Sequence, residues 1–294
     1  MSLSARVRAQ AKINLLLRVL AREANGYHSI ETVLHRIDLA DDVGVRVTSG
    51  RSLDCTGPAL PPDGLGPTEK NLAFRAATTY ASETGWPDGF AIELVKNIPV
   101  GAGLGGGSAD AGAVLRALDE LSPAPLGPRL VELASGLGAD VPFLTTDSPM
   151  ALAWGRGERL LLVRPIDPRT ILLVVPDFAI ATADAYAWLA SDRGDYVPTA
   201  AVIDAQALAS WDAIGAMAVN DFESVVARRH PRIAELVAVI QSMNPILAML
   251  AGSGSGVFGV FDEYPDPSAV VRTTGATVIR TRTSDRVDRV EREV

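Results

Sequence analysis

A glycine-rich stretch between two apolar segments is the part of the sequence best suited to bind phosphate. Five glycines lie within residues 101–107, after an apolar run at 90–95 and before a helical pattern that reaches residue 121. Glycine permits positive φ angles and leaves the backbone open, so successive N–H groups can converge on an anion. The N-terminus of the following helix adds unpaired N–H groups and its dipole. The stretch therefore predicts a phosphate cradle, with a glycine-rich packing turn as the alternative.

Two common phosphate-binding signatures do not account for this loop. The Walker pattern is absent, because the chain contains no Gly-Lys-Ser or Gly-Lys-Thr sequence. The dinucleotide pattern Gly-x-Gly-x-x-Gly matches at 101–106, but it also matches at 254–259. That pattern needs an acidic residue at a strand end about 20 residues on, whereas Glu120 falls inside a predicted helix. An NAD-binding oxidoreductase therefore remains only as an alternative.

Two further sets of polar residues lie far from this loop in the sequence. Residues 11–19 alternate in polarity as a strand does, which places Lys12 and Asn14 on one face, roughly 6.5 Å apart. Asp140 follows a helical pattern at 129–136, and Pro142 is expected to prevent a helix from continuing. Asp140 is therefore predicted on a loop just past a helix end, where an aspartate can act chemically or cap a turn.

The elements that position these groups follow from the spacing of apolar residues. The spacing predicts strands at 11–19, 30–39, 43–48, 90–95, 171–175, 257–261 and 277–282, and helices at 71–82, 111–121, 129–136, 182–190 and 233–243. Residues 57–67 are predicted as a loop, and the charged tail from Asp285 is expected to be solvated. The pattern indicates an α+β chain in two domains, divided near residues 150–160.

Composition excludes several classes of function. With 294 residues the chain is about twice the usual domain length, which also favours two domains. Its 27 basic and 35 acidic residues give a formal charge of −8, which opposes nucleic-acid binding. Cys55 is the single cysteine, so an intramolecular disulfide is excluded and a reducing cytoplasm is expected. Charged residues interrupt the apolar run after residue 11, so no signal peptide is expected. Pro245 and four glycines interrupt the longest uncharged stretch, 241–261, so no membrane span or membrane partner is expected.

Six blocks of sequence together resemble a known family. Residues 99–108, Pro-x-x-x-Gly-Leu-Gly-Gly-Gly-Ser, resemble the ATP-binding motif of the GHMP kinases. Blocks at 11–15, 26–28, 71–72, 138–142 and 252–254 follow in the order of that family, so the resemblance covers nearly the whole chain. The triple glycine is typical of the branch that uses ATP to phosphorylate the 2-hydroxyl of 4-diphosphocytidyl-2-C-methyl-D-erythritol in the non-mevalonate isoprenoid pathway.

The resemblance implies a two-domain GHMP kinase fold. Residues 1–156 would form a ribosomal-protein-S5-like α/β domain, and residues 157–294 a ferredoxin-like α/β domain, with the active site in the cleft between them. The glycines at 252–254 would pack against the phosphate loop from the second domain. The resemblance also implies ATP as co-substrate, Mg²⁺, and a cytoplasmic enzyme that is a monomer or weak homodimer.

Roles for single residues follow from the same resemblance. Asp140 would accept the hydroxyl proton, and Lys12 would keep Asp140 ionised and stabilise developing charge. Nucleotide contacts are implied for Asn71, Lys96, Pro99, Gly101, Gly103, Leu104, Gly105, Gly106, Gly107 and Ser108, with Ser108 also a candidate Mg²⁺ contact. Substrate contacts are implied for Asn14, Tyr27, His28, Tyr186, Gly252 and Ser253.

The substrate residues have distinct expected tasks. Tyr27 and His28 would stack on and hydrogen-bond a cytosine, Tyr186 would cover its opposite face, and Asn14 would reach the erythritol hydroxyls. The chain departs from many relatives at Asp110, where they carry asparagine. Asp110 is expected to cap the helix or to lie near Mg²⁺, the cap being favoured.

Two other activities remain compatible with the resemblance. A mevalonate or homoserine kinase would share the loop and the fold, but the Gly-Tyr-His block and the triple glycine argue against it. A non-catalytic nucleotide-binding module is the other, and the presence of both Lys12 and Asp140 argues against that.

Overall fold

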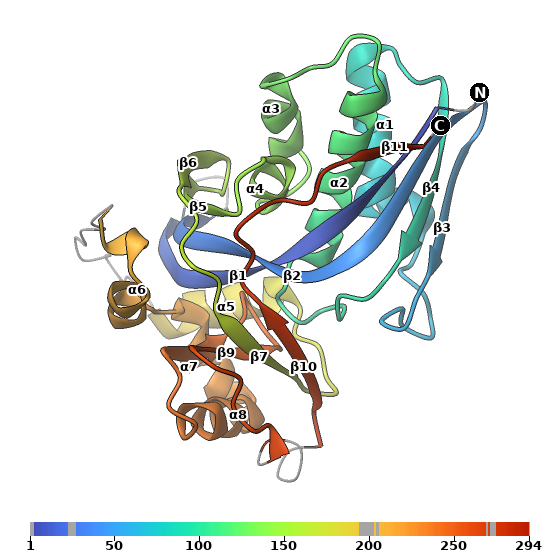
Figure 1. The fold of residues 1–294 in the computed structure, drawn as a ribbon. Coiled ribbons are helices and arrows are strands. Elements are labelled where there is room, and N and C mark those ends of the chain that lie inside the picture. Colours follow the sequence, from blue (N-terminus) through green and yellow to red (C-terminus); the bar gives the residue numbers. More distant parts are fainter. Residues whose placement is uncertain are drawn as a thin grey trace.

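The first part of the chain is built on a sheet with two long antiparallel strands. The structure is a computed structural model that describes residues 3–22, 28–193, 203, 206–268, 270 and 275–293. Figure 1 shows the two long strands crossing the upper part of the molecule. The sheet has the order β11-β1-β2-β4-β3, and β5 and β6 extend it from the other half of β2. Its strands are β1 (Ser4–Arg22), β2 (His28–Thr48), β3 (Arg51–Thr56), β4 (Gly89–Val95), β5 (Met150–Gly155), β6 (Arg159–Val163) and β11 (Glu291–Glu293).

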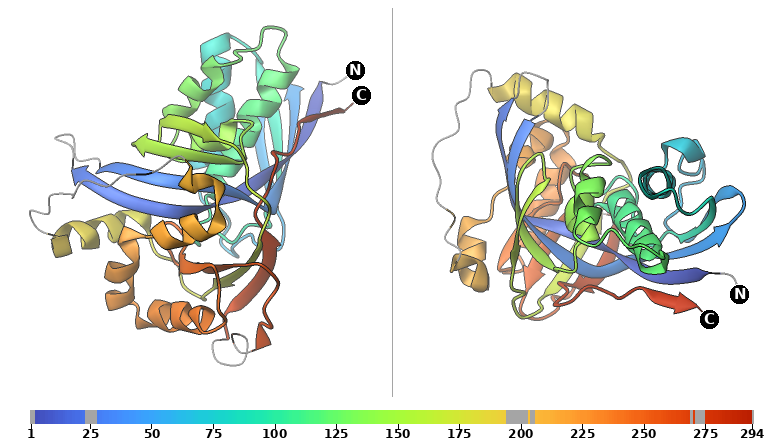
Figure 2. Two further views of the ribbon diagram at one scale, coloured as in Figure 1. Left: turned by 60° about the vertical axis from the view of Figure 1, so that its left-hand side comes forward. Right: turned by 90° about the horizontal axis from the view of Figure 1, so that it is seen from above.

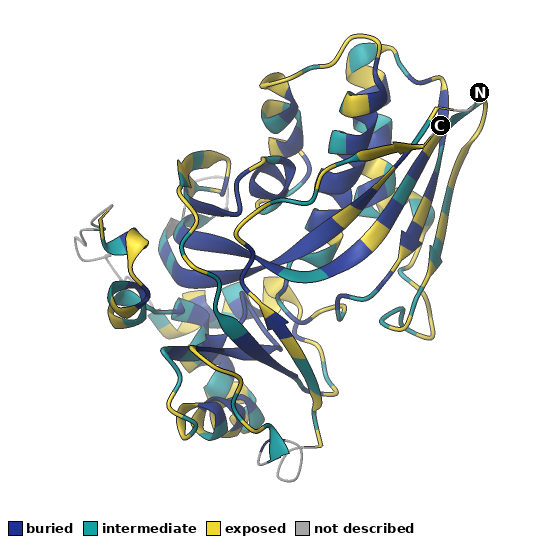
Figure 3. Ribbon diagram, viewed as in Figure 1, coloured by how far each residue is buried: buried dark blue, intermediate teal, exposed yellow. Residues whose placement is uncertain are grey.

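Four helices cover one face of this sheet. Ala111, Val114, Leu115 and Leu118 are buried on α2, at the helical spacing that the sequence predicts. Figure 3 shows the facing sides of helices and sheet as one buried layer. The helices are α1 (Leu72–Thr84), α2 (Gly106–Leu121), α3 (Arg129–Ser135) and α4 (Val141–Thr145), and a short 3₁₀ turn spans Thr68–Lys70.

A second, smaller sheet and the helices that accompany it form the rest of the molecule. The strands of this sheet are antiparallel in the order β10-β7-β9-β8, and helices pack against it. The elements are β7 (Thr170–Val175), β8 (Leu247–Leu250), β9 (Val257–Phe261), β10 (Thr277–Arg282), α5 (Thr182–Arg193), α6 (Trp211–Met217), α7 (Asp221–Arg229) and α8 (Pro231–Gln241), with a 3₁₀ turn at Ala207–Ala209. The expected α+β class is confirmed. The division at 156/157 stays a prediction, although β6 pairs with β5 and so belongs to the first sheet.

The two strands predicted at 30–39 and 43–48 are one strand, β2. The acidic residues Asp41 and Asp42 suggest a break between them in the sequence. Asp41 nevertheless lies in the strand, fully buried, because the backbone N–H groups of Asn97 and Ile98 donate to its carboxylate.

A short helix follows Asp140 where the sequence predicts only a loop. Helix α4 begins at Val141, and Pro142 lies in its first turn. Proline is tolerated there because the first N–H groups of a helix have no partner within it. Asp140 is therefore the residue immediately before a helix, and not only one that follows the end of α3.

The tail from Asp285 is not simply solvated. Residues 291–293 form β11, which pairs antiparallel with β1, so that the two ends of the described chain lie close together (Figure 2). Gln10, which is buried, donates to Ser284 Oγ at 2.8 Å and accepts from Asp288 N at 3.1 Å. No helix among the described ranges has the length and apolar character to cross a membrane.

Candidate active site

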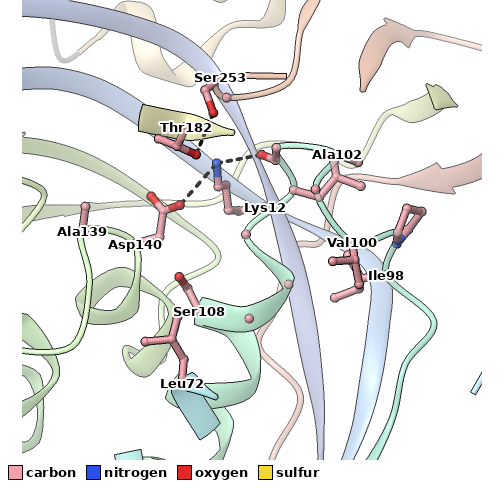
Figure 4. A pocket seen from close by; sticks show the side chains of 18 of the residues that line it. Lys12, Leu72, Ile98, Val100, Ala102, Ser108, Ala139, Asp140, Thr182 and Ser253 are labelled. Carbon is pink, nitrogen blue, oxygen red and sulfur yellow. Dashed lines mark hydrogen bonds and ion pairs between the residues drawn. The ribbon is translucent and has the colours of Figure 1, made fainter. Parts of the chain in front are cut away.

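A cavity of about 520 Å³ lies where the glycine-rich loop meets the second sheet and its helices. Figure 4 shows the ammonium end of Lys12 close to Asp140, Thr182 and Ser253, and Ser108 farther along the cavity. Strand β1, the loop and α2 line it from the first part of the chain, while α5, Phe222 and the turn at 252–253 line it from the second. The cavity therefore lies in the cleft between the two parts, as expected.

Lys12 joins three parts of this cavity. Its Nζ donates to Asn14 Oδ1 at 2.8 Å and to Gly103 O at 2.9 Å, and it lies 3.4 Å from Asp140 Oδ2 (Figure 4). An ammonium group has three protons to donate, and here each has a partner. Because only 5% of the side chain is exposed, the Lys12–Asp140 attraction is screened less than that of a surface pair.

The glycine-rich loop is held through its carbonyl oxygens. Gly101 O accepts from Ser255 N and Ala102 O accepts from Gly256 N, both at 3.2 Å. Leu104 O accepts from the backbone N–H of Lys12 at 3.0 Å. Because these partners use the carbonyl side, they leave the N–H groups of the loop available for an anion.

Two glycines of the loop are required by close contacts. Gly103 and Gly105 have φ angles of 76° and 71°, which favour glycine. A Cβ atom at residue 103 would lie 1.9 Å from Ala251 O, and one at residue 105 would lie 2.9 Å from Lys12 Cε. The loop can therefore approach the second domain and Lys12 only because these positions lack side chains.

The second glycine cluster packs against the first, as the resemblance implies. The Ser255 and Gly256 N–H groups bind the loop, and the Ser253 hydroxyl lies 3.0 Å from Thr182 Oγ1. Asn220, the residue before α7, donates from Nδ2 to Gly252 O at 2.7 Å. These contacts fix the turn at 252–256 over the loop.

Tyr186 and Phe222 line the cavity, and Tyr186 forms a ring pair with His28. The rings of His28 and Tyr186 stack with centroids 4.9 Å apart, and Phe222 meets Tyr186 edge-on at 4.8 Å. Burial, together with the charge of Asp140, raises the pKa of Tyr186 to about 12, so the phenol stays protonated. Tyr27 lies outside the described residues. The His28 ring occupies the space directly beside one face of Tyr186.

Lys96 and Asp110 both line the cavity and form a buried ion pair there. The Lys96 side chain is buried, and its Nζ donates to Asp41 Oδ2 and to Asp110 Oδ2. A buried cation needs such partners, and the contact of Lys96 with nucleotide stays a prediction. Asp110 lies inside α2, whose N-cap is Gly105, so Asp110 does not cap the helix.

The pKa values of this buried pair follow from their surroundings. Burial raises the pKa of Asp110, although the charge of Lys96 acts in the opposite direction. Burial alone would lower the pKa of Lys96, but the charges of Asp110 and Asp41 outweigh it and raise the pKa. Each side chain therefore depends on the others for its charge state.

Several residues around the cavity were not predicted. Lys70, Leu65, Thr182 and Phe222 line it, and the only sequence signal for Lys70 is that it precedes the Asn71-Leu72 block. Asn71 also lines the cavity, where its side chain accepts from Ala73 N at 2.9 Å and so caps α1.

Comparison with known proteins places the chain in a family. Residues 71–148 match the family described as GHMP kinases N terminal domain, and residues 204–279 match GHMP kinases C terminal. The chain belongs to the GHMP kinase family. As a GHMP kinase it is an ATP-dependent small-molecule kinase, and the alternative of an NAD-binding oxidoreductase is not favoured.

Two relatives within the GHMP kinase family carry the same name. The 4-diphosphocytidyl-2-C-methyl-D-erythritol kinase of Salinibacter ruber is 36% identical over 282 residues, covering 93% of this chain and 95% of that protein. The protein of the same name from Pelotomaculum thermopropionicum is 38% identical over 283 residues, covering 94% and 96%.

Solved structures agree with this placement. A crystal structure of 4-(cytidine 5'-diphospho)-2C-methyl-D-erythritol kinase superposes with a TM-score of 0.73 at 30% identity, covering 95% of this chain and 99% of that chain. The homoserine kinase of Cytophaga hutchinsonii has a TM-score of 0.68 at 17% identity, covering 99% and 97%, which shows a shared fold alone.

Proposed function

We propose that this GHMP kinase transfers the γ-phosphoryl group of ATP to the 2-hydroxyl of 4-diphosphocytidyl-2-C-methyl-D-erythritol, giving the 2-phosphate and ADP in the non-mevalonate isoprenoid pathway. The observation that carries the proposal is the Lys12–Asp140 pair, 3.4 Å apart, beside the glycine-rich loop. The relatives named for this substrate match the chain over almost its whole length, which supports this alcohol over mevalonate or homoserine.

The pair and the loop divide the work of phosphoryl transfer. Such transfer needs the reactants aligned, the phosphate charge neutralised and a group that receives the hydroxyl proton. In this proposal the N–H groups of the loop bind the phosphates of ATP, Asp140 accepts the proton, and Lys12 stabilises the developing negative charge. Since Lys12 Nζ also binds Gly103 O, it sets the distance between Asp140 and the loop.

Ser108 fits a role in holding Mg²⁺ with the nucleotide. Its half-buried hydroxyl lines the cavity in the first turn of α2. The described residues contain no group of three or more His, Cys, Asp or Glu that could hold a metal alone, which suits an ion carried mainly by phosphate oxygens. When bound with ATP, the ion would neutralise phosphate charge.

The substrate end of the cavity begins at Asn14. Its Oδ1 accepts from Lys12, and its Nδ2 donates to Thr32 Oγ1 at 2.8 Å, which fixes the amide next to the reacting groups. We assign Asn14 to the erythritol hydroxyls, and the pair of His28 and Tyr186 to the cytosine. The nearby Gly252 and Ser253 would contact substrate or phosphate from the second domain.

The compartment and the oligomeric state of the enzyme are part of the proposal. We infer a cytoplasmic enzyme that acts as a monomer or weak homodimer on two small-molecule ligands. The single cysteine, Cys55, supports a reducing compartment. Sedimentation at several protein concentrations measures the association directly.

Measurement of ADP release with ATP, Mg²⁺ and a panel of alcohols tests the function. We expect turnover with the cytidyl substrate and none with mevalonate or homoserine. Asp140→Asn should lower kcat by about 10²–10⁴, the usual range for a general base. The matched control is Asp147→Asn, because the Asp147 side chain is 93% exposed and does not line the cavity. Turnover of another alcohol in preference, or an Asp140→Asn rate within a few-fold of wild type, would contradict the proposal.

A further inference from the structure

Three buried charged side chains lie at the base of the nucleotide loop. Lys96 follows β4, Asp41 belongs to β2 and Asp110 belongs to α2. Their side chains are 3%, 0% and 3% exposed. We call these three residues the root cluster. They come from three different parts of the chain, Lys96 and Asp110 also line the cavity, and none of the three is given a role on the reacting atoms.

The root cluster joins the two ends of the loop. Lys96 Nζ donates to Asp41 Oδ2, and also to Asp110 Oδ2 at 2.5 Å. The other oxygen of Asp41 accepts from the backbone N–H groups of Asn97, at 2.5 Å, and Ile98, at 2.8 Å. Residues 96–98 lead into the loop, and Asp110 lies in α2 just beyond it. The cluster therefore connects the chain before the loop to the helix after it.

The cluster also lies directly beneath the first residue of α2. A Cβ atom on Gly106 would lie 3.1 Å from Ile98 Cγ2 and 3.7 Å from Asp41 Oδ2. The helix N-terminus, whose N–H groups face the proposed phosphate position, therefore rests on the side chain that holds Ile98. A change in the cluster would shift this helix end and the loop together.

A loop that binds phosphate needs this kind of external support. Its N–H groups must stay unpaired until ATP arrives, and glycine loses more backbone freedom on ordering than any other residue. Lys12 and the turn at 255–256 hold the carbonyl oxygens of residues 101–104. The root cluster ties residues 96–98, which lead into the loop, to the helix that follows it.

Stability alone does not explain the cluster. Burying one cation with two carboxylates is costly, and well-packed apolar residues are often equally stable or more so. The second oxygen of Asp110 is buried and has no hydrogen-bond partner among the described residues, which adds to the cost.

We infer that the root cluster is a positioning device that sets the spacing between the two ends of the nucleotide loop and so determines the affinity for ATP. Asp41, Lys96 and Asp110 are positioning residues in this inference, because they act through the loop and not on the reacting atoms. The inference rests on the proposed role of the loop in binding ATP, but not on the identity of the alcohol substrate.

Asp110→Leu is the decisive variant. Leucine has a similar size, removes the unpaired buried oxygen and cuts the tie between Lys96 and α2. We expect the dissociation constant for ATP, measured by calorimetry without alcohol, to rise by about ten- to a hundredfold, as for a misplaced binding group. The KM for the alcohol and the melting temperature should change little. Asp110→Asn, which keeps an oxygen acceptor for Lys96, should restore most of the affinity.

Asp119→Leu is the matched control on the same helix. Asp119 accepts from the Tyr80 hydroxyl at 3.0 Å and from Leu126 N at 2.6 Å, at the far end of α2 from the loop. It should lower the melting temperature and leave the affinity for ATP unchanged. A purely structural role for the root cluster would make Asp110→Leu behave in the same way, and this result would overturn the inference.

A second variant tests the root cluster if Asp110→Leu does not fold. The double variant Lys96→Met/Asp110→Leu cuts the same tie and removes the cation together with one of its carboxylates, so it replaces Asp110→Leu if that protein does not fold. It should show the same loss of ATP affinity, and affinity within twofold of wild type in either folded variant would overturn the inference. If the cytidyl substrate is not phosphorylated but ATP affinity falls as expected, the proposed substrate fails and the inference stands.

Discussion

Lys12 directs its three ammonium protons at three different parts of the site. One partner, Asn14, is on the same strand, another is the carbonyl of Gly103 in the loop, and the third is Asp140 before α4. A single buried cation thus connects the proposed alcohol position, the nucleotide loop and the proposed base. Replacement of Lys12 would therefore disturb both the charge and the geometry of the site.

His28 is the residue that tests the cytosine assignment. Replacing it by alanine removes the ring stacked on Tyr186, so we expect the KM for the cytidyl substrate to rise roughly tenfold or more, as stacking on a base contributes ~1–3 kcal/mol. The KM for ATP should not change. His230→Ala is the control, because His230 also stacks on an aromatic ring, that of Phe178 at 5.0 Å, but Phe178, unlike Tyr186, does not line the cavity. An unchanged KM for the cytidyl substrate would refute the assignment.

His35 makes the stability of the fold depend on pH. Burial lowers its pKa from 6.5 to about 4, although its Nδ1 lies 2.8 Å from Arg36 O. Between these values the unfolded chain binds a proton that the folded chain does not, so stability falls as the pH falls through this window. His35→Asn removes this effect. Urea unfolding should show that wild type loses roughly 2 kcal/mol more than the variant between pH 7.5 and pH 5; equal losses would contradict the assignment.

Helix α4 carries the proposed base at one end and is held at the other. Asp140 precedes its first residue, and the buried guanidinium of Arg36 donates to Phe143 O at 3.1 Å and Thr146 O at 2.9 Å. Burial lowers the pKa of Arg36 to about 9. The groups that accept from its guanidinium in α4 and just after it are backbone carbonyls. Arg36 on β2 lies opposite Lys12 on β1 in the strand register. The same pair of strands therefore positions both Lys12 and the helix that follows Asp140.

The glycine-rich loop gives a sharp prediction about packing. Gly103→Ala would place a methyl group 1.9 Å from Ala251 O, so the loop must move away from the turn at 252–256. We expect the KM for ATP to rise by at least about tenfold. Gly64→Ala is the control, because Gly64 has a similar φ of 71° but nothing within 4 Å of the added atom. It should cost about 1 kcal/mol of stability with no change in KM; similar KM values in the two variants would contradict the prediction.

Elements with one clear apolar face could be predicted closely. The expected helix at 129–136 is observed as Arg129–Ser135, and the strand at 90–95 as Gly89–Val95. Helix α4 could not be predicted, because proline suits the end of one helix as well as the first turn of the next. The continuity of β2 at Asp41 depends on Lys96, Asn97 and Ile98, 55 to 57 residues away, and periodicity carries no information about such partners.

The candidate site could be predicted in part, and this prediction came from the family resemblance and not from the spacing of apolar residues. Lys12 and Asp140 are far apart in sequence, and it was the ordered blocks of the family that brought them together, not their spacing. The same resemblance predicted a nucleotide contact for Lys96. It could not predict that Asp41 and Asp110 bury the ammonium group, because this depends on how β2, β4 and α2 meet in three dimensions.

At the scale of the molecule, the tail of the chain completes the first sheet. The buried side chain of Gln10 has its partners in Ser284, Arg286 and Asp288. Removal of residues 285–294 should therefore lower the free energy of unfolding by several kcal/mol, about 1–3 of it from Gln10. Because the tail does not line the cavity, the KM values should not change.

A double-mutant cycle separates the contribution of Gln10. Gln10→Leu should destabilise the full chain, and it should destabilise the truncated chain less, since Gln10 there keeps Ser284 but has lost Arg286 and Asp288 as partners. Denaturant unfolding of the four proteins measures this coupling. Equal effects of Gln10→Leu in both backgrounds would show that the tail is not the partner that matters.

The pairing of β11 with β1 also matters while the protein is being made. The ion pair between Arg6 and Glu293 joins residues 287 positions apart. At about 5–20 residues per second, β1 leaves the ribosome roughly 15 to 60 s before its partner. During that interval an open strand edge invites pairing with other nascent chains, and exposed charges oppose it. Arg6 and Arg8, which later bind the tail, would thus first act as gatekeepers against aggregation on the polysome.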